Sequence, residues 1–270
     1  MCDVLNISEP LLLDYDFDDQ LIEDVYNEES SIFDLPYELY LFTFLNLITP
    51  VHRLFGLPSD QKTKALARTA TRMKNSVSIF SGAKTFQNVL DLSMSVFDDR
   101  GNKRPINEFR KIAKGINQNY NVNYLRTENN LAFRQSEAVG YWKEIQNEKD
   151  IFPFLRYNAV NDPRTRDEHE VHDGVLKPVD DPFWDSWFPP NGWNCRCIVE
   201  RVASGTPDNT KYPENEEGLF NTNTGKTGVI FPKKHPYNEV PEEFKQAKKN
   251  NFGLKALSDN DIKKIIDGNN

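Results

Sequence analysis

Two cysteines separated by a single residue, Cys195 and Cys197, are the side chains of this 270-residue chain best suited to chemistry. His169 and His172 precede them in the sequence. Alternation along a strand that begins at the first cysteine would place both thiols on one face. Two thiolates and two imidazoles are ligands that zinc accepts in a tetrahedron. One interpretation is therefore a zinc site at these four residues. The other, which we favour, is a structural cluster of buried thiols and hydrogen-bonded histidines that holds loops together without a cofactor.

Catalysis by the same residues has less support. The third cysteine, Cys2, leaves an odd number, so a disulfide scaffold is not expected, and a C-x-C pair lacks the C-x-x-C spacing of redox sites. The run from Glu168 to His172 spaces its histidines three apart, whereas a zinc protease needs two histidines four apart on a helix. The Asp-Pro before this run and Asp173-Gly174 after it favour a short turn. We therefore predict no catalytic residues and no enzyme.

Arginines and aspartates surround the cysteines and histidines in the sequence. An arginine binds a carboxylate through two parallel hydrogen bonds, so we expect such pairs to fix a loop-rich core. The candidates are Asp162, Arg164, Arg166, Asp173, Asp180, Asp181 and Arg196.

Three tryptophans lie among prolines in the same region: Trp184, Trp187 and Trp193, with Pro182, Pro189 and Pro190. Such a group forms a rigid aromatic platform, which we expect to pack over the strand that carries the thiols. Aromatic rings beside arginines also stack on unpaired bases, but the acidic flanks make this the weaker alternative.

The pattern of apolar residues predicts an α+β fold, with a helical N-terminal half followed by a compact β-rich region with long loops. Helices are expected at 59–80, 83–97, 105–120 and 124–146, with Ser59 and Pro105 as start signals, and a short helix at 242–249. Strands are expected at 154–160, 171–176 and 195–202. We divide the chain into an acidic N-terminal arm with a docking segment (1–58), a helical region (59–150), a β-rich signature region (151–203) and a polar C-terminal tail (204–270).

Charge is distributed unevenly along the chain. Residues 1–50 hold twelve Asp or Glu and no Lys or Arg, which predicts a weakly ordered acidic arm over the first 35 residues, followed by an apolar segment that stops near Pro50. Residues 51–90 hold seven Lys or Arg, on what would be a basic helix. Solvated faces or intersubunit contacts explain such blocks best. Contact with DNA is the alternative for Lys62, Lys64, Arg68, Arg72 and Lys74.

No apolar run approaches the roughly 20 residues of a membrane span. No basic segment precedes such a run, as it would in a signal peptide. We expect a soluble protein made in the cytoplasm.

Two polar residues, Glu128 and Asn130, interrupt the apolar pattern of the helix at 124–146. We expect a buried, satisfied polar pair, with an arginine of the signature region as partner, rather than a catalytic pair.

Three stretches resemble, in order and separation, the head-morphogenesis family of phage Mu F-like minor head proteins. The first is Ala83-Lys84-Thr85-Phe86 with the helices that follow it, and the second runs from Arg126 to Phe133 and leads to Trp142. The third and most specific stretch contains Tyr157, Asp162, Arg164, Arg166, His169, Gly174, Asp180, Asp181, Trp184, Pro190, Trp193, Cys195, Arg196 and Cys197.

The resemblance implies a minor head protein of a tailed phage or prophage, present in few copies and acting at the portal vertex in head assembly, DNA packaging or ejection. Its expected partners are the portal protein, other head or scaffold proteins and packaged DNA, without a membrane. Its expected location is the virion, and the host cytoplasm during assembly. Some relatives carry C-x-x-C where this chain has Arg166 and His169. Because arginine does not bind a metal, this difference weighs against a four-ligand zinc site unless His172 substitutes.

Two rival functions remain open. A nuclease or toxin-type effector ranks second, because Mu F-like domains are often joined to such domains. The tail after Val202 has a single histidine, His235, and no visible catalytic constellation. A nucleic-acid-binding module carried by residues 62–74 ranks third, and it predicts DNA affinity that falls steeply with salt.

Overall fold

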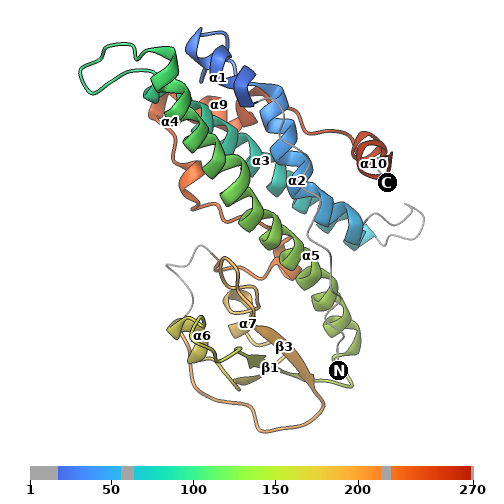
Figure 1. The fold of residues 1–270 in the computed structure, drawn as a ribbon. Helices are drawn as coiled ribbons and strands as arrows, with labels where there is room; N and C mark the ends of the chain where they lie inside the picture. Colours follow the sequence, from blue (N-terminus) through green and yellow to red (C-terminus); the bar gives the residue numbers. More distant parts are fainter. Residues whose placement is uncertain (1–17, 56–63, 214–219, 269–270) are drawn as a thin grey trace. The chain divides into compact units, whose positions relative to one another are not determined.

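The computed structural model describes residues 18–55, 64–213 and 220–268 (Figure 1). These residues divide into two compact units. The helical unit contains residues 18–49, 77–130 and 236–268, and the signature unit contains residues 50–55, 64–76, 131–213 and 220–235. Each unit is assembled from segments far apart in the sequence, and the consecutive division into four regions stays a prediction. Among the helices described, none is both long enough and apolar enough to cross a membrane.

The fold is α+β, as predicted, with a helical N-terminal half and a small sheet after it. Three helices contribute to both units: α2 (Tyr37–Phe55), α3 (Lys64–Ser95) and α5 (Leu125–Glu148). The helical unit also contains α1 (Asp18–Tyr26), α4 (Ile106–Gln118), the π-helix η2 (Asn119–Tyr124), η3 (Pro236–Asn238), η4 (Glu242–Phe244), α9 (Lys245–Lys249), η5 (Asn251–Gly253) and α10 (Asp259–Gly268). The signature unit contains β1 (Phe154–Asn158), α6 (Asp167–Glu170), β2 (Leu176–Pro178), α7 (Phe183–Ser186), β3 (Ile198–Val202) and α8 (Thr224–Thr227).

Helix α1 lies within the stretch predicted as a weakly ordered acidic arm, and that prediction is wrong for residues 18–26. Its apolar residues, spaced as on one face of a helix, are buried in a core shared with Phe109 of α4: Leu21, Ile22 and Val25. The carboxylates lie outside this core, where Lys114 of α4 approaches Asp19 at 2.9 Å. Lys114 of α4 therefore partly neutralises the negative charge of α1, a segment that has no Lys or Arg of its own. Residues 1–17 of the predicted arm lie outside the described residues.

Helix α3 is continuous where the sequence predicted a break between residues 80 and 83. A Cβ atom at Gly82 would lie 2.1 Å from Oδ1 of Asn251, so this glycine admits a neighbouring side chain rather than ending a helix. The predicted start signal at Ser59 lies outside the described residues.

The helices predicted at 105–120 and 124–146 also run on without a break, through α4, η2 and α5. The π-helix η2 fills the predicted gap, because a wider helical turn accommodates an inserted residue without interrupting the backbone. The predicted stripe of α5 is confirmed, since all of its members are buried: Leu125, Leu131, Ala132, Val139, Trp142 and Ile145.

Helix α2 continues past Pro50, where the sequence predicted that it stops. A proline has no N–H group, so the carbonyl of Asn46 cannot receive the usual hydrogen bond from residue 50. The side-chain amide of Asn129 donates to that carbonyl instead, at 2.6 Å. A buried amide on α5 thus supplies a donor that the proline removes from α2.

A buried ion pair, rather than the predicted arginine contact, holds Glu128. Its Oε2 lies 2.5 Å from Nζ of Lys84, and both side chains are almost completely buried. Its Oε1 accepts a hydrogen bond of 3.1 Å from the Tyr237 hydroxyl. Asn130, the expected companion of Glu128, is exposed. The predicted polar pair is therefore wrong in its partner, although Glu128 is buried and satisfied as expected.

The sheet has three antiparallel strands in the order β2-β1-β3, with Tyr157 of β1 opposite Val199 of β3. The strand predicted from residue 195 begins later, at Ile198. The predicted alternation nevertheless holds through the cysteines, since Cys195, Cys197 and Val199 are buried while Ile198 is exposed.

The strand predicted at 171–176 is wrong, because the chain turns there and β2 starts only at Leu176. The Asp173 carboxylate accepts hydrogen bonds from the Ala159 amide at 2.8 Å and from the Asn161 side chain at 2.6 Å. Gly174 has a φ of 77°, in the left-handed region that glycine adopts without strain. An Asp-Gly pair here makes a turn. The short helix predicted at 242–249 is confirmed as η4 and α9.

Candidate functional site

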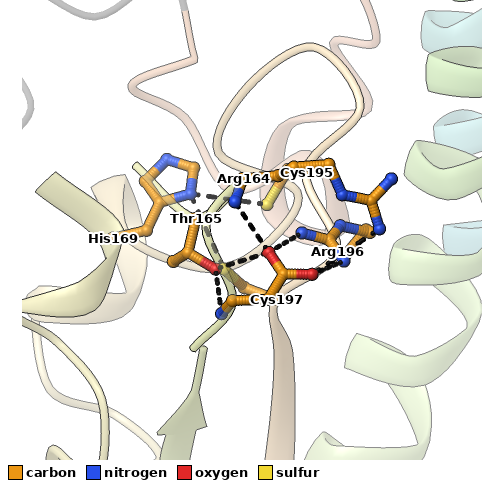
Figure 2. A network of polar contacts seen from close by, with 7 residues as sticks. Arg164, Thr165, His169, Cys195, Arg196 and Cys197 are labelled. Atoms are coloured by element: carbon orange, nitrogen blue, oxygen red, sulfur yellow. Dashed lines mark hydrogen bonds and ion pairs between the residues drawn. The ribbon is translucent and has the colours of Figure 1, made fainter. Parts of the chain in front are cut away.

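A buried cluster of His169, Cys195 and Cys197 is the candidate site of the signature unit. Nδ1 of the histidine lies 3.9 Å from Sγ of Cys195 and 3.6 Å from Sγ of Cys197. One ligand atom from each of the three residues lies within 4.8 Å of the other two. Figure 2 shows the imidazole directed at the sulfur atoms from across the turn. The structure thus brings together three of the four predicted zinc ligands.

Local structure explains why the two thiols face the histidine. The cysteines alternate into the core just before β3, and α6 is a single turn of helix that carries His169 inward while its neighbours remain exposed. Trp184 and Trp187 belong to the same core as both cysteines, as predicted for the aromatic platform, whereas Trp193, its third predicted member, does not. Three separate parts of the sequence therefore pack together to hold the cluster: α6, the segment before β3, and the segment with the tryptophans.

Hydrogen bonds on the far side of the thiols involve Tyr157 and Asn191. The Tyr157 hydroxyl lies beside Cys197 and donates to Oδ1 of Asn191 at 3.2 Å. Asn191 in turn donates from its side chain to the Ser186 carbonyl at 3.1 Å. Asn191 was missed as a site residue, although its place in the run before the cysteines was a signal that could have found it.

The two thiols share a proton unequally. A hydrogen bond from the Cys197 thiol, followed by the contact with His169, lowers the pKa of Cys195 despite burial. The pKa of Cys197 is raised, first by its hydrogen bond to Cys195 and then by burial. These contacts therefore favour the thiolate form of Cys195, which is the form of cysteine that binds metals.

His172, the fourth predicted ligand, does not join the cluster. Its ring lies 4.0 Å, centroid to centroid, from that of Trp187 and also contacts Phe183, Tyr157 and Tyr212. Burial lowers the pKa of His172 to about 4, so the ring is neutral at physiological pH. Within the described residues this histidine is part of an aromatic core.

A carboxylate, Asp162, connects the loop before α6 to the segment before β3 that carries the cysteines. Arg196 donates to both of its oxygens, each at 2.6 Å, which is a bidentate pair of the kind that the sequence predicted without naming the partners. The Arg164 amide donates to Oδ1 of Asp162 at 2.9 Å. Because Arg196 binds the charged form, the pKa of Asp162 is held well below its usual range. The pair thus fixes the wall of the candidate site.

Among the described residues, the other predicted arginines and aspartates form no second bidentate pair, although Nη2 of Arg164 lies 3.5 Å from Oδ2 of Asp162 as an ion pair. Arg166 donates to the Trp193 carbonyl at 2.8 Å. Asp180 is exposed and lies 3.1 Å from Lys149. Asp181 accepts from the amide of Phe183 at the start of α7, at 2.8 Å.

The remaining members of the signature have structural contacts. Pro190 follows a cis peptide bond, and its carbonyl accepts a hydrogen bond of 3.4 Å from Gln135. The Trp193 ring packs edge-on against Phe220, with ring centroids 5.2 Å apart, and against His235. His235, considered for the nuclease alternative, is buried beside that ring.

The predicted basic residues on α3 are largely accessible. Lys64, Arg68 and Arg72 are exposed, Lys74 is half-buried, and Lys62 lies outside the described residues. Arg68 and Arg72 are one helical turn apart, so their side chains share a face.

Comparison with known proteins identifies the region that contains this site. Residues 101–200 match the family model described as phage Mu protein F like protein. This region, called the Mu F-like region below, is similar to that family. It includes α4, α5, β1 and the whole His169, Cys195 and Cys197 cluster, and it leaves out the basic part of α3.

Two curated relatives match over part of the chain. A protein of Escherichia phage Mu named as a capsid assembly protein F is 39% identical over 80 residues, or 30% of this chain. The Mu-like prophage FluMu F protein of Haemophilus influenzae is 42% identical over 79 residues, or 29% of this chain. Each match spans 18% of the relative's own length. No solved structure matches the chain.

Proposed function

We propose that this chain acts in phage head morphogenesis as a minor head protein. The observation that carries the proposal is the match of residues 101–200 to the Mu F-like family, one of whose relatives is named for capsid assembly. The site described above supports a structural role, because its charged groups are engaged in fixing loops: Asp162 with Arg196, and Arg166 with a backbone carbonyl. We propose no catalytic activity for it.

The finer part of the proposal concerns place and partners. The chain would act at the portal vertex, in few copies, with the portal protein and other head or scaffold proteins as partners. The exposed Arg68 and Arg72 on α3 form a positively charged face, which is complementary to the negative charge of packaged DNA. The location would be the virion, and the host cytoplasm during assembly.

Deletion and complementation in the phage or prophage that encodes the chain test this function. Without the chain, electron microscopy of lysates is expected to show few normal DNA-filled heads, and the wild-type chain supplied in trans should restore them. Normal numbers of filled, infectious heads without the chain would contradict the proposal.

The nuclease or toxin alternative makes a different prediction. Purified chain would cleave DNA or RNA, and His169→Ala or His235→Ala would abolish the cleavage. We expect no cleavage by the wild-type chain under conditions in which a control nuclease is active. Cleavage that either substitution removes would reverse the ranking of the two functions.

A further inference from the structure

Three potential ligand atoms in the signature unit already have the spacing of a metal's coordination sphere. With Zn–S bonds of about 2.3 Å and Zn–N bonds of about 2.05 Å, a tetrahedron separates sulfur from nitrogen by about 3.6 Å and two sulfurs by about 3.8 Å. The Nδ1 atom of His169 lies 3.9 Å and 3.6 Å from the sulfurs of Cys195 and Cys197, and one ligand atom of each lies within 4.8 Å of the others. Both nitrogen–sulfur distances are thus within about 0.3 Å of the tetrahedral value, whereas the two sulfurs, at most 4.8 Å apart, would approach one another by up to about 1 Å on binding zinc.

Charge and burial favour a metal at this place. All three side chains are at least nine-tenths buried, and two thiolates would balance the charge of a zinc ion. Buried charges are stable when they are paired or coordinate a metal. Without a metal, the imidazole contacts the two sulfurs at 3.9 and 3.6 Å, and such contacts are weaker than zinc–thiolate bonds.

The orientation of the imidazole is also that of a ligand. Its Nδ1 faces both sulfurs, whereas Nε2 faces away from them, with the Glu168 carboxylate 3.9 Å distant and no hydrogen-bond partner among the described residues. Histidines that bind metals commonly present their second ring nitrogen to a carboxylate or a carbonyl. On the opposite side, the hydroxyl of Tyr157 lies beside Cys197.

The fourth coordination position opens into a small pocket. The pocket is lined by the three cluster residues together with Thr165, Arg166 and Asn194, among others. His172 is packed among aromatic rings and does not reach it. A zinc ion with three protein ligands keeps its fourth position for water or another exchangeable ligand.

We propose that His169, Cys195 and Cys197 bind one zinc ion, with solvent as the fourth ligand in the pocket. The ion joins α6 to the turn before β3, two segments that no backbone hydrogen bond of the sheet connects. This inference is independent of the head-assembly function, because a metal-free protein could still assemble heads and a zinc protein could fail to do so.

Zinc content of the full chain, purified under reducing conditions and measured by mass spectrometry of the metal, tests the proposal. One zinc per chain is expected in the wild type, with loss of nearly all of it in His169→Ala and Cys197→Ser. His172→Phe is the matched control, because it removes the nearby imidazole but keeps a ring in the aromatic core; it should retain the zinc. Wild-type protein that takes up no zinc after incubation with the metal, or loss of zinc in His172→Phe equal to that in His169→Ala, would overturn the three-ligand site.

Cobalt titration of the wild-type chain keeps the test decisive if the ligand variants fail to fold. Cobalt in the proposed site should give a thiolate charge-transfer band and the intense visible bands of tetrahedral geometry. Azide added to this form should shift the visible bands, because it would replace the solvent ligand. Weak octahedral bands without thiolate charge transfer would overturn the site, and bands that azide leaves unchanged would overturn the open fourth position.

Discussion

At the scale of single residues, the organisation of the signature unit depends on Asp162. Its carboxylate accepts hydrogen bonds from both guanidinium nitrogens of Arg196 and from the Arg164 amide. A bidentate contact fixes orientation as well as distance, which a single ion pair does not. Because Arg196 stands between the two cysteines, its position also sets where the thiols lie.

The first prediction concerns the pH dependence of this contact. The folded-state pKa of Asp162 is held well below its usual range by Arg196, so folding favours the ionised carboxylate. The stabilisation is therefore present above the unfolded-state pKa of about 3.9 and is lost as pH falls toward the folded-state pKa. Asp162→Asn should lower the Tm at pH 7 and have a diminishing effect below about pH 4. Thermal unfolding followed by circular dichroism measures both.

Asp180→Asn is the control for that prediction, because this aspartate also belongs to the signature but is exposed beside Lys149. It should change the Tm little at either pH. Equal effects of the two substitutions at pH 7 would show that the bidentate contact is not what stabilises the unit.

The second prediction concerns the buried pair of Lys84 and Glu128. Lys84→Met leaves the carboxyl of Glu128 buried without its cation and should cost about 3–5 kcal/mol of unfolding free energy. Adding Glu128→Leu should recover much of that loss, since no buried charge then remains. Arg134→Met, which removes the cation of an exposed pair with Glu137, should cost no more than about 1 kcal/mol. Denaturant unfolding checks all three, and a Lys84→Met cost as small as that of Arg134→Met would show that Glu128 does not depend on its cation.

Sequence reasoning at this scale succeeded where the determining factors were local. The alternation of Cys195, Arg196 and Cys197 and the Asp162 pair followed from strand geometry and side-chain chemistry. The direction of His172 did not, because it depends on a turn in which the chain reverses after α6. The partner of Glu128 could not be predicted either, since Lys84 lies on another helix and its charge gave no sign of burial.

At the scale of elements, glycine and proline were the misleading residues. Both commonly end helices, yet Gly82 and Pro50 lie inside α3 and α2. An asparagine from elsewhere in the chain lies at each position. The Asn251 side chain occupies the space that a Cβ atom at Gly82 would need. The Asn129 side chain donates to the Asn46 carbonyl, which Pro50 leaves without its N–H donor. Helix existence was therefore predictable from periodicity, whereas these continuations depend on tertiary contacts.

The third prediction compares two helical glycines. A Cβ at Gly82 would meet the Asn251 side chain, whose amide donates to the Leu254 carbonyl at 3.0 Å, so Gly82→Ala should destabilise the protein. Gly115 in α4 has open space around its Cα, and Gly115→Ala should stabilise by about 0.5–1 kcal/mol. Chemical denaturation of the two variants checks the signs. A stabilising Gly82→Ala would show that this glycine is not required by close packing.

The fourth prediction concerns the basic face of α3. Replacing both Arg68 and Arg72 by Glu should weaken DNA binding and reduce its dependence on salt, by a slope of about 0.9 for each phosphate that the helix no longer neutralises. The same charge change at Lys263 and Lys264, exposed on α10, serves as the control and should have a smaller effect. Fluorescence anisotropy with duplex DNA at several salt concentrations measures the slope. Absent or salt-insensitive binding by the wild type would remove DNA from the proposed partners.

At the scale of the whole molecule, the two units differ in how much of each is covered by the match to the Mu F-like family. Most of the signature unit lies in the Mu F-like region, as do α4 and the start of α5 in the helical unit. Helices α1, α2 and α3 and the segment after residue 200 lie outside the match. The sequence predicted the α+β class and the Mu F-like region, because both depend on patterns along the chain. It did not predict that separated segments form each unit, since that pairing follows from tertiary packing.

The most direct test of the central claim is the amount of this chain in purified heads. Heads from the phage or prophage that encodes the chain would be isolated by density gradient, and the chain counted against the major head protein by quantitative mass spectrometry. We expect the chain to copurify with heads in a fixed ratio, in far fewer copies than the major head protein. Its absence from heads at every stage of assembly, with the chain present in the same lysate, would contradict a role as a minor head protein.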